Sequence, residues 1–358
     1  MPATCLYSVG AYTQLPETGG KIMTSKSKIA RDKVVQEMAD AVMKAIKSGE
    51  KPWLKPWDTS KCTTGLAHNV ASGKPYRGVN QFYLSIASID IEFASYKQWA
   101  EVGRKHAVAN DEWEWAEDGK GKRFKKATEY YGVQKGSSSH TVIYFTIIKK
   151  EDKETGEESR IPILKWFRVF GRSQTNIPAP YVEPPTEDEL PKFTERQEAI
   201  EQQIYDWMEA EGITFDNGGT RAFYRYATDH IQMPDKIAFP SGYAYMPTLL
   251  HESVHATGHR KRLSRKMGSG FGSEDYAFEE LVAEMGASLL CRHFNILPTE
   301  ALEDGLENQV SYIANWLKRL QSNPKMLISA GSKAQRAMDY ILGTTFDYDD
   351  KKEVKTDE

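Results

Sequence analysis

The chain has 358 residues, which is more than one average domain holds, so its length predicts two domains. A hydrophobic content of 40% with 11% aromatic residues supports ordinary cores and excludes a disordered protein. The three cysteines, Cys5, Cys62 and Cys291, form no C-x-x-C pair, which excludes a disulfide framework and favours a reducing, cytoplasmic setting. No apolar run is long enough to cross a bilayer, so we expect no membrane partner.

The net charge of −3 conceals a difference between the two halves of the chain. Residues 24–180 carry 27 Lys and Arg against 19 Asp and Glu, whereas residues 181–358 carry 19 against 30. The basic half suits a polyanion such as nucleic acid, and the acidic half does not. Ordinary variation between domains would give the same split, so charge alone does not decide the function.

The chain begins with a leader, a helix and a proline-rich loop. Residues 1–23 lack the basic and then apolar profile of a signal peptide, and we interpret them as a disordered leader. Apolar residues then recur with helical spacing, which predicts an amphipathic helix over residues 29–49. Prolines follow, which stop the helix and hold Trp53 and Trp57 in a loop.

A second loop, residues 68–80, combines cations, an aromatic ring and an amide around glycines, in Lys74, Tyr76, Arg77 and Asn80. Cations neutralise phosphate, aromatic faces accept unstacked bases, and glycine lets the backbone approach a ligand. Together with Trp53 and Trp57, these residues predict a surface for single-stranded DNA. Packing in a core is the alternative interpretation for most of the tryptophans.

Two predicted strands follow in the basic half. Residues 83–92 are predicted to be helical, and Trp113 and Trp115 precede a cluster of Lys and Arg. Residues 141–148 and 164–170 are rich in β-branched and aromatic residues, which predicts a pair of strands. We expect the charged segment between them to be a solvated extension of the hairpin. No helix-turn-helix or zinc-finger spacing indicates reading of a DNA groove.

The segment 177–192 holds five of the chain's 16 prolines and several acidic residues, which predicts a stiff linker between two domains. Beyond it we expect a helix over residues 196–212 and two short strands within residues 218–233. Residues 242–250 are strand-like and lead into a segment with two histidines. A strand beside a metal-binding helix offers its edge to an extended peptide.

His251, Glu252 and His255 form the pattern H-E-x-x-H, which constrains the function more than any other segment. Residues four apart on a helix project from nearly the same side, so His251 and His255 are placed to hold one Zn²⁺. Zinc lowers the pKa of a bound water towards ~7, and Glu252 then takes its proton as the general base of a metallopeptidase. Two unrelated histidines on a surface helix are the alternative interpretation.

The metal needs a third protein ligand, and its identity stays open at this point. Lys261 stands where the motif H-E-x-x-H-x-x-G-x-x-H places a third histidine, so that motif is excluded. His259 would share the face only if the helix continued through Gly258, which favours a turn. The next helical segment places Glu280 and Glu284 on one face. One of them, with Glu280 slightly favoured, would bind the metal, and the other would orient a ligand histidine.

The remaining segments predict a loop, two helices and a tail. Residues 260–272 are basic and then glycine-rich, which predicts a mobile cover over the cleft. Apolar spacing predicts a helix over residues 306–321 and a shorter one over residues 332–342. The charged residues 346–358 predict a disordered tail.

In this order the motifs resemble those of the ArdC-type antirestriction proteins of conjugative plasmids and phages, and those of the N-terminal regions of plasmid primases. The resemblance extends over residues 24–340 and rests most on residues 51–57, 72–80, 251–259 and 276–286. The block from His251 to His259 is its most specific part.

The resemblance implies an α+β protein that protects incoming DNA from host restriction. A mixed α/β domain that binds single-stranded DNA, residues 24–176, would precede a mainly helical zincin-like metallopeptidase domain with a small sheet, residues 193–345. Lys135 begins a turn that is less charged than is usual in the family, and we include it with the residues expected to contact DNA. The expected cofactor is Zn²⁺ or another divalent metal, and the expected peptidase substrate is a host protein or peptide.

Two other functions stay open. The chain fits a non-enzymatic protein that coats single-stranded DNA and uses its zincin domain as a structural platform. It also fits a general intracellular zinc protease whose basic domain selects acidic protein substrates. The sequence alone does not separate these functions, because a competent metal site does not show that peptides are cut.

Overall fold

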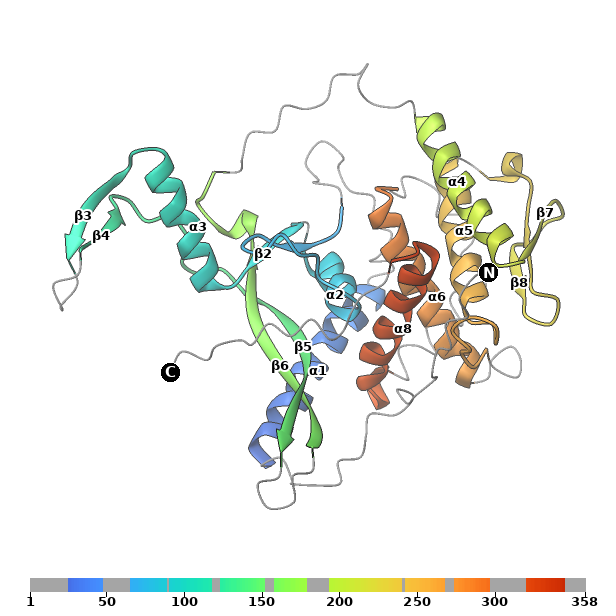
Figure 1. Ribbon diagram of the computed structural model, residues 1–358, viewed down its shortest axis with the longest axis horizontal. Coiled ribbons are helices and arrows are strands. Elements are labelled where there is room, and N and C mark those ends of the chain that lie inside the picture. Colours follow the sequence, from blue (N-terminus) through green and yellow to red (C-terminus); the bar gives the residue numbers. More distant parts are fainter. Residues whose placement is uncertain are drawn as a thin grey trace.

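The computed structural model describes residues 25–47, 65–88, 90–117, 123–151, 158–178, 193–239, 242–267, 274–296 and 320–344. The predicted leader, the predicted tail, Trp53 and Trp57 lie outside the described residues. So do almost all of the predicted linker, the glycine-rich part of the predicted cover and nearly all of the helix predicted over residues 306–321. The protein is of the α+β class, as predicted, with a curled sheet and helices followed by a mostly helical region (Figure 1). Among the described helices, none combines the length and the apolar character that crossing a bilayer requires.

Helix α1, Ser25–Lys47, confirms the first predicted helix. Its buried side chains recur at the spacing of one helical face, and include Val34, Met38 and Val42. This spacing is the reason that the segment is helical, because one stripe of the helix packs into the core while the remaining surface stays polar. The helix ends two residues before the predicted Gly49.

The first sheet has the strand order β1-β2-β6-β5. Strands β1, His68–Asn69, and β2, Glu92–Ala94, run parallel, and β2 is antiparallel to β6, Glu158–Gly171. Strand β6 pairs along its length with β5, His140–Glu151, which confirms the predicted pair of strands. The pairing continues to Glu151 and Glu158, so both ends of the predicted charged loop, residues 149–160, are strand, and the rest of that loop lies outside the described residues.

The helix predicted over residues 83–92 is displaced towards the N-terminus. Helix α2 spans Val79–Ala87, and β2 begins at Glu92. The residue before the helix, Gly78, has a φ of 56°, a left-handed conformation in which glycine is the favoured residue. Helix α2 buries Phe82 and Leu84 among other apolar residues, and that burial fixes where the helix lies.

A separate two-stranded sheet follows helix α3, Tyr96–Ala109. Ser95 and Gln98 form a capping box at the start of α3, which satisfies backbone groups that the helix leaves unpaired. Strand β3, Trp113–Glu117, pairs with β4, Arg123–Ala127, and this hairpin lies at one end of the molecule (Figure 1).

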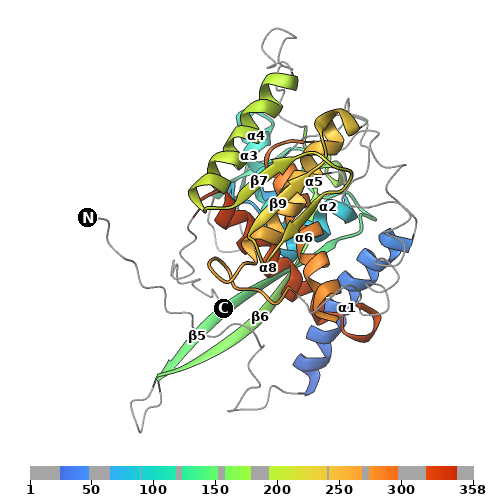
Figure 2. The same cartoon turned by 90° about the vertical axis from the view of Figure 1, so that its right-hand side faces the viewer.

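Strands β7, Thr214–Asn217, β8, Phe223–Arg225, and β9, His230–Met233, form the small sheet of the C-terminal half, in the order β7-β9-β8. Strands β8 and β9 confirm the two predicted strands, whereas β7 was not predicted. It follows helix α4, Phe193–Ala210, which confirms the helix predicted over residues 196–212. Figure 2 shows β7 and β9 on one side of the histidine-bearing helix α5.

The prediction of a strand at residues 242–250 is wrong, because helix α5 spans the whole of Gly242–Thr257. Tyr245, Met246, Leu249 and Leu250 are fully buried, and their spacing puts them on one helical face. A short apolar run does not distinguish a strand from a buried helix, and here burial on that face decides for the helix. The helix ends at Thr257, so the turn predicted at Gly258 is confirmed.

Helices α6, Glu274–His293, and α8, Lys325–Ile341, pack beside α5 and complete the core. Helix α8 is longer than the helix predicted over residues 332–342. It also touches the N-terminal half, because a Cβ on Gly331 would lie 2.6 Å from the backbone nitrogen of Val79. Gly78 donates its backbone N–H to the side chain of Gln335 at 2.8 Å. A single apolar core therefore includes residues of both halves.

Candidate metal centre

His251, His255 and Glu280 meet between helices α5 and α6. The two histidines lie one turn apart on α5, and their Nε2 atoms are 3.1 Å from each other. Glu280 reaches both from α6, with one carboxylate oxygen 3.5 Å from Nε2 of His251 and the other 3.5 Å from Nε2 of His255. One ligand atom of each residue lies within 4.8 Å of the other two. The motif and the glutamate predicted to be its third ligand are thus brought together.

This arrangement fits a tetrahedral divalent ion. Zinc binds imidazole nitrogen and carboxylate oxygen at about 2.0–2.2 Å, which puts neighbouring tetrahedral ligands about 3.3 Å apart. The two Nε2 atoms are 3.1 Å apart, and each lies 3.5 Å from a different oxygen of Glu280, so all three separations are close to that value. Three protein ligands are also the number found in catalytic zinc sites, which keep a fourth position for water or substrate. The chain therefore carries a metallopeptidase-type His-His-Glu site.

Two further glutamates of α6 face the outer nitrogens of the histidine rings. Glu284 has a carboxylate oxygen 3.8 Å from Nδ1 of His251, and Glu279 has one 3.5 Å from Nδ1 of His255. A carboxylate on the nitrogen that does not face the metal holds a ligand histidine in the required orientation and tautomer. Glu284 was considered as a ligand from the sequence, but it is not among the three residues whose ligand atoms converge.

Sequence reasoning missed Glu279 and its partner Arg265. The guanidinium of Arg265 donates to both oxygens of Glu279, at 2.6 to 3.1 Å, and also to the backbone oxygen of Val254 and the hydroxyl of Thr257. Both charged side chains are almost fully buried, with 4% and 2% exposed. Arg265 lies in the loop predicted to be a mobile cover, and this buried ion pair ties that part of the loop to α5 and α6. The pairing of Arg265 with Glu279 depends on how the loop and α6 pack together, so no local sequence pattern indicates it.

The charges of the site raise the pKa of both histidines. Burial by itself lowers the pKa of His251 and His255, but contact with Glu280 and the surrounding carboxylates outweighs burial. In turn, burial raises the pKa of Glu280, but the charges of His255 and His251 outweigh it and hold this pKa far below its usual range. The carboxylates of the site therefore favour a positive charge between them, which is the charge that a divalent metal ion would carry.

Glu252 differs from the other glutamates of the site. It is buried on α5 next to His251, yet in the described part of the chain its carboxylate forms no hydrogen bond or ion pair. Glu279, by contrast, is fully occupied by Arg265 and His255. A carboxylate without a fixed partner is available to accept a proton, which is the role predicted for Glu252.

His259 lies outside the cluster, in the turn after α5. Its Nδ1 is 3.6 Å from Asp229, and its ring is 4.7 Å from that of Tyr226. Asp229 also accepts hydrogen bonds from Arg262 and, at 2.8 Å, from Tyr224. Arg262 continues to the backbone oxygen of Ala256 at 2.7 Å. This network ties the turn between β8 and β9 to the end of α5 that carries His255.

Helices α5 and α6 approach closely at a glycine. A Cβ on Gly286 would lie 2.8 Å from a methyl carbon of Val254, which leaves no room for a larger residue. Ala283 and Ala287, two further small residues of α6, are both buried. The close contact is what lets the glutamates of α6 reach the histidines of α5.

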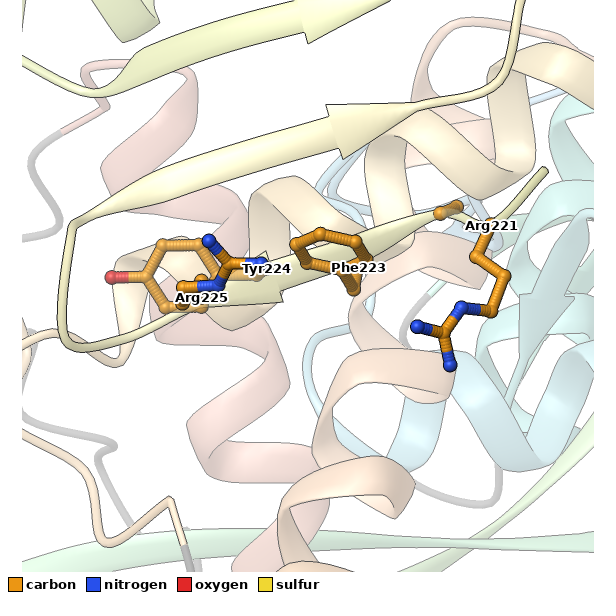
Figure 3. Close-up of a pocket in the computed structure, with 5 residues that line it drawn as sticks. Arg221, Phe223, Tyr224 and Arg225 are labelled. Atoms are coloured by element: carbon orange, nitrogen blue, oxygen red, sulfur yellow. The ribbon is translucent and has the colours of Figure 1, made fainter. Parts of the chain in front are cut away.

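A shallow pocket lies along β8, lined by Arg221, Ala222, Phe223, Tyr224 and Arg225 (Figure 3). Strand β8 is an edge of the small sheet and packs against α5. Tyr224 and Ala222 pack against the apolar core, whereas Phe223 does not contribute to it. The pocket is thus formed by one strand beside the histidine-bearing helix.

The described residues that were predicted to bind DNA differ in their surroundings. Lys74 and Lys135 are exposed. Tyr76 is half-buried against the core and Arg77 forms an ion pair with Asp339 of α8. The Asn80 side chain accepts the backbone N–H of Ile143 at 2.8 Å and donates to the backbone oxygen of the same residue at 2.7 Å.

Exposed aromatic residues lie instead on the two hairpins. Tyr144, Trp166 and Phe167 are exposed on β5 and β6, and sequence reasoning missed them. The signal that could have found them is the aromatic content of those strands, since they hold more aromatic rings than one buried face of a sheet accommodates. Trp115 is exposed on β3, in the aromatic and basic segment that the sequence did indicate.

Family models match both halves of the chain. A model described as the N-terminal domain of the anti-restriction factor ArdC matches residues 32–170, and a zincin-like metallopeptidase model, MPTase-PolyVal, matches residues 202–333. Two crystal structures of the antirestriction ArdC protein from the R388 plasmid, one metal-free and one with Mn(II) bound, are similar to this chain with TM-scores of 0.60. They share 27% and 26% identity with it and match 86% of this chain and 96% and 97% of theirs.

Two curated proteins are also similar to the chain. An uncharacterized protein, y4eC, of Sinorhizobium fredii (strain NBRC 101917 / NGR234) is 31% identical over 317 residues, which is 86% of this chain and 91% of that protein. A DNA primase TraC of Escherichia coli is 30% identical over 320 residues, but the match spans only 19% of the primase. The chain therefore belongs to the ArdC family of antirestriction proteins, with an ArdC-type N-terminal domain and a zincin-like metallopeptidase domain.

Proposed function

We propose that this protein protects the incoming DNA of a plasmid or phage from host restriction, binds single-stranded DNA through its N-terminal region, and acts as a zinc-dependent peptidase. The observation that carries the proposal is the convergence of His251, His255 and Glu280, with Glu252 beside them. We assign the first three as ligands of Zn²⁺ or of another divalent metal, since the R388 relative was crystallised with Mn(II).

The residues of the site divide the chemistry between them. A bound divalent ion polarises the scissile carbonyl and favours ionisation of water. The carboxylate of Glu252 accepts a proton from the attacking water and passes it to the leaving nitrogen. Glu284 and Glu279 hold the rings of His251 and His255 in orientation, and Arg265 fixes Glu279 in turn.

The hairpin of β3 and β4 supports the proposal for DNA. Its register places Trp113, Trp115, Arg123 and Lys125 on one face. The ammonium of Lys125 lies 3.6 Å from the ring centroid of Trp113, and the guanidinium of Arg123 lies 4.9 Å from that of Trp115. Rings interleaved with cations suit a single strand, because bases stack on the rings while cations neutralise phosphates.

The hairpin of β5 and β6 offers a second surface of the same kind. Tyr144 and Phe167 are 55% and 50% exposed, and the register places both on one face with Lys165, which lies opposite Tyr144. Large aromatic side chains of a sheet are usually buried, so the exposure of these two leaves apolar surface available to a ligand. We propose that this aromatic face and the β3–β4 hairpin bind the strand, with Lys74 and Lys135 as further phosphate contacts and with Trp53, Trp57, Tyr76, Arg77 and Asn80 kept as predictions from the sequence.

A second candidate function is protection by coating DNA without peptide cleavage. It is favoured by one observation, namely that the aromatic and cationic surfaces belong to the hairpins of the N-terminal half and use no residue of α5 or α6. DNA binding would then need no metal. The solved R388 relative exists in both metal-free and Mn(II)-bound structures, which agrees with a fold that forms without the ion.

A restriction-protection assay with Glu252→Ala separates the two functions. Incoming plasmid DNA is delivered to restricting and non-restricting hosts, and the ratio of recovered recipients is measured. We expect Glu252→Ala to keep its metal and its single-stranded-DNA binding but to lose protection. The matched control is Glu209→Ala, which removes an exposed glutamate of α4. Retained protection in Glu252→Ala would instead establish the coating function.

A further inference from the structure

Strand β8 has one edge without a partner strand. It pairs with β9 only, and among the described residues no backbone hydrogen bond forms on its other side. The edge is short and carries a pocket formed by five consecutive residues (Figure 3). Unpaired N–H and C=O groups along an edge strand are the groups that another extended chain binds.

The side chains along this edge alternate between two environments. Tyr224 faces the core, where its hydroxyl donates to Asp229 at 2.8 Å. Because successive residues of a strand point to opposite faces, Phe223 and Arg225 share the outer face. The guanidinium of Arg225 lies 5.0 Å from the ring centroid of Phe223, which holds it along the strand. Arg221 lies two residues before the strand begins and lines the same pocket, which therefore presents cation, ring and cation in sequence.

Neither arginine is neutralised by the protein. Both are exposed, and in the part of the chain that the structure describes they form no ion pair. On the same face of the sheet, Asp216 lies on the opposite edge strand, 4.0 Å from His230. Two unpaired arginines stand out in a half of the chain in which acidic residues outnumber basic ones by 30 to 19.

We propose that the free edge of β8 binds an extended polypeptide segment in which acidic side chains flank an apolar one at alternate positions, and that it presents this segment to the metal centre. Paired as a neighbouring strand, such a segment would place its carboxylates opposite Arg221 and Arg225 and its apolar side chain opposite Phe223. The inference rests on the proposed peptidase function, because it names the class of substrate for that site.

The position of β8 relative to the metal ligands supports a shared site. Arg262 connects Tyr224 and Asp229 to the backbone oxygen of Ala256, the residue after His255. The edge strand is therefore fixed to the turn of α5 that carries a metal ligand. A segment bound along β8 would run beside the histidine-bearing helix.

A polypeptide fits this edge better than a nucleic acid. Alternating N–H and C=O groups are matched by another peptide backbone, whereas a phosphodiester backbone supplies acceptors only. Phe223 is half-buried and packed beside Arg225, so it offers less free ring surface than Trp115 or Tyr144. Single-stranded DNA is accordingly assigned to the N-terminal hairpins, and its binding to β8 is an outcome that the test must exclude.

The test measures peptide binding by fluorescence anisotropy with the full-length Glu252→Ala protein loaded with zinc, so that bound peptide is not cut. The probe is a labelled peptide with glutamate, leucine and glutamate at alternate positions, and its counterpart has lysines in place of the glutamates. We expect the acidic peptide to bind about ten-fold more tightly, and the double change Arg221→Glu with Arg225→Glu to reverse that preference. Reversal shows that the variant is folded. Arg336→Glu, on α8, is the matched control and should change nothing.

Three results would overturn the inference. The first is equal binding of both peptides, and the second is an unchanged preference after the double charge reversal. The third is that the double charge reversal weakens binding of an oligothymidylate by the same factor as binding of the acidic peptide. Cleavage by the unaltered protein is followed separately by mass spectrometry. Specific binding of the acidic peptide without cleavage counts against the peptidase function and against presentation to the metal centre, and it leaves only the peptide-binding edge standing. Cleavage of both peptides at one rate refutes the inference alone.

Discussion

The metal centre and the N-terminal hairpins are built in opposite ways. Between α5 and α6, charged side chains are buried and hold one another, as Arg265 and Glu279 do with 4% and 2% of their surface exposed. On the hairpins, Trp115 and Tyr144 are each 55% exposed and project from short-range strand pairs. A buried, mutually constrained cluster suits one small ion in a fixed geometry. Exposed rings and cations spread over two hairpins suit a long ligand that binds through many weak contacts.

This contrast orders the expected effects of mutation. In the metal centre a single change leaves a buried group without its partner, so we expect large losses that differ sharply between neighbouring residues. On the hairpins each side chain supplies one of several similar contacts, so we expect small losses that add.

The largest effect is expected at the third ligand. We expect the double change His251→Ala with His255→Ala to reduce bound zinc to a background level, because two of the three proposed ligands are lost. Glu280→Gln alone should have the same effect, because it removes the only carboxylate ligand. Glu284→Gln should keep the ion and weaken its affinity by about 10- to 100-fold, as changes to groups that orient a ligand do. Bound zinc is measured by mass spectrometry after dialysis. If Glu280→Gln kept zinc and Glu284→Gln lost it, Glu284 would be the ligand and Glu280 the residue that orients a histidine.

The buried ion pair should give the largest change in stability. Arg265→Ala leaves Glu279 charged and buried, and we expect the free energy of unfolding to fall by about 3–5 kcal/mol. Chemical denaturation of the metal-free protein measures it without a contribution from metal binding. Arg336→Ala, which removes an exposed arginine, should change stability by no more than about 0.5 kcal/mol. A loss below about 1 kcal/mol in Arg265→Ala would show that the loop is not held by this pair.

The network at Asp229 should give an intermediate and pH-dependent loss. Burial raises the pKa of Asp229, but hydrogen bonds from Arg262 and Tyr224 outweigh it, so the pKa is lowered. Stability from a lowered pKa is present above the unfolded value of about 3.9 and is lost as the pH falls through the folded value. We expect Asp229→Asn to cost about 1–3 kcal/mol at pH 7, and the difference from the unaltered protein to shrink below pH 4. A difference that does not depend on pH would exclude the carboxylate charge as its cause.

The convergence of His251, His255 and a glutamate of α6 was predictable, because residues four apart on a helix share one face. That spacing applies equally to Glu280 and Glu284, so it does not choose between them. The choice of Glu280 over Glu284 depends on how α6 is rotated against α5, which a contact between Gly286 and Val254 sets. That contact joins residues 32 positions apart, and no local pattern contains it.

Which polar and aromatic residues of the N-terminal half are exposed was less predictable, because composition does not decide which way a side chain points. Asn80 has the polarity of a base-reading residue, yet its amide bridges to the backbone of Ile143 on a distant strand. Arg77 likewise pairs with Asp339, more than two hundred residues away. The strands of the aromatic face were correctly predicted, but which of their rings stay exposed depends on what packs on each side of the sheet. Tyr144 and Phe167 are exposed because the apolar core packs against other residues of these strands.

Substitutions of exposed aromatic residues and of the hydrogen-bonded Asn80 test the same contrast within the N-terminal half. We expect Tyr144→Ala and Phe167→Ala each to weaken binding of an oligothymidylate by about 1–3 kcal/mol while leaving the unfolding transition unchanged. Asn80→Ala should do the reverse, because it leaves the backbone of Ile143 without its partners and costs about 1–3 kcal/mol of stability. Binding is measured by anisotropy and stability by denaturation on the same preparations. Loss of DNA affinity in a fully stable Asn80→Ala protein would instead support the prediction from the sequence that Asn80 contacts DNA.

The smallest effect is expected at the exposed lysines, and it appears in salt dependence rather than in affinity at one salt concentration. If Lys74 contacts a phosphate, Lys74→Ala removes one released counterion, and the slope of log K against log salt should fall by about 0.7 for single-stranded DNA. Arg77→Ala should leave the slope unchanged, because Asp339 already neutralises Arg77 in the folded protein. Lys135→Ala repeats the test on a different loop. Equal slopes for all three variants would confine the electrostatic contact to the hairpins, where Arg123, Lys125 and Lys165 stand beside the exposed rings.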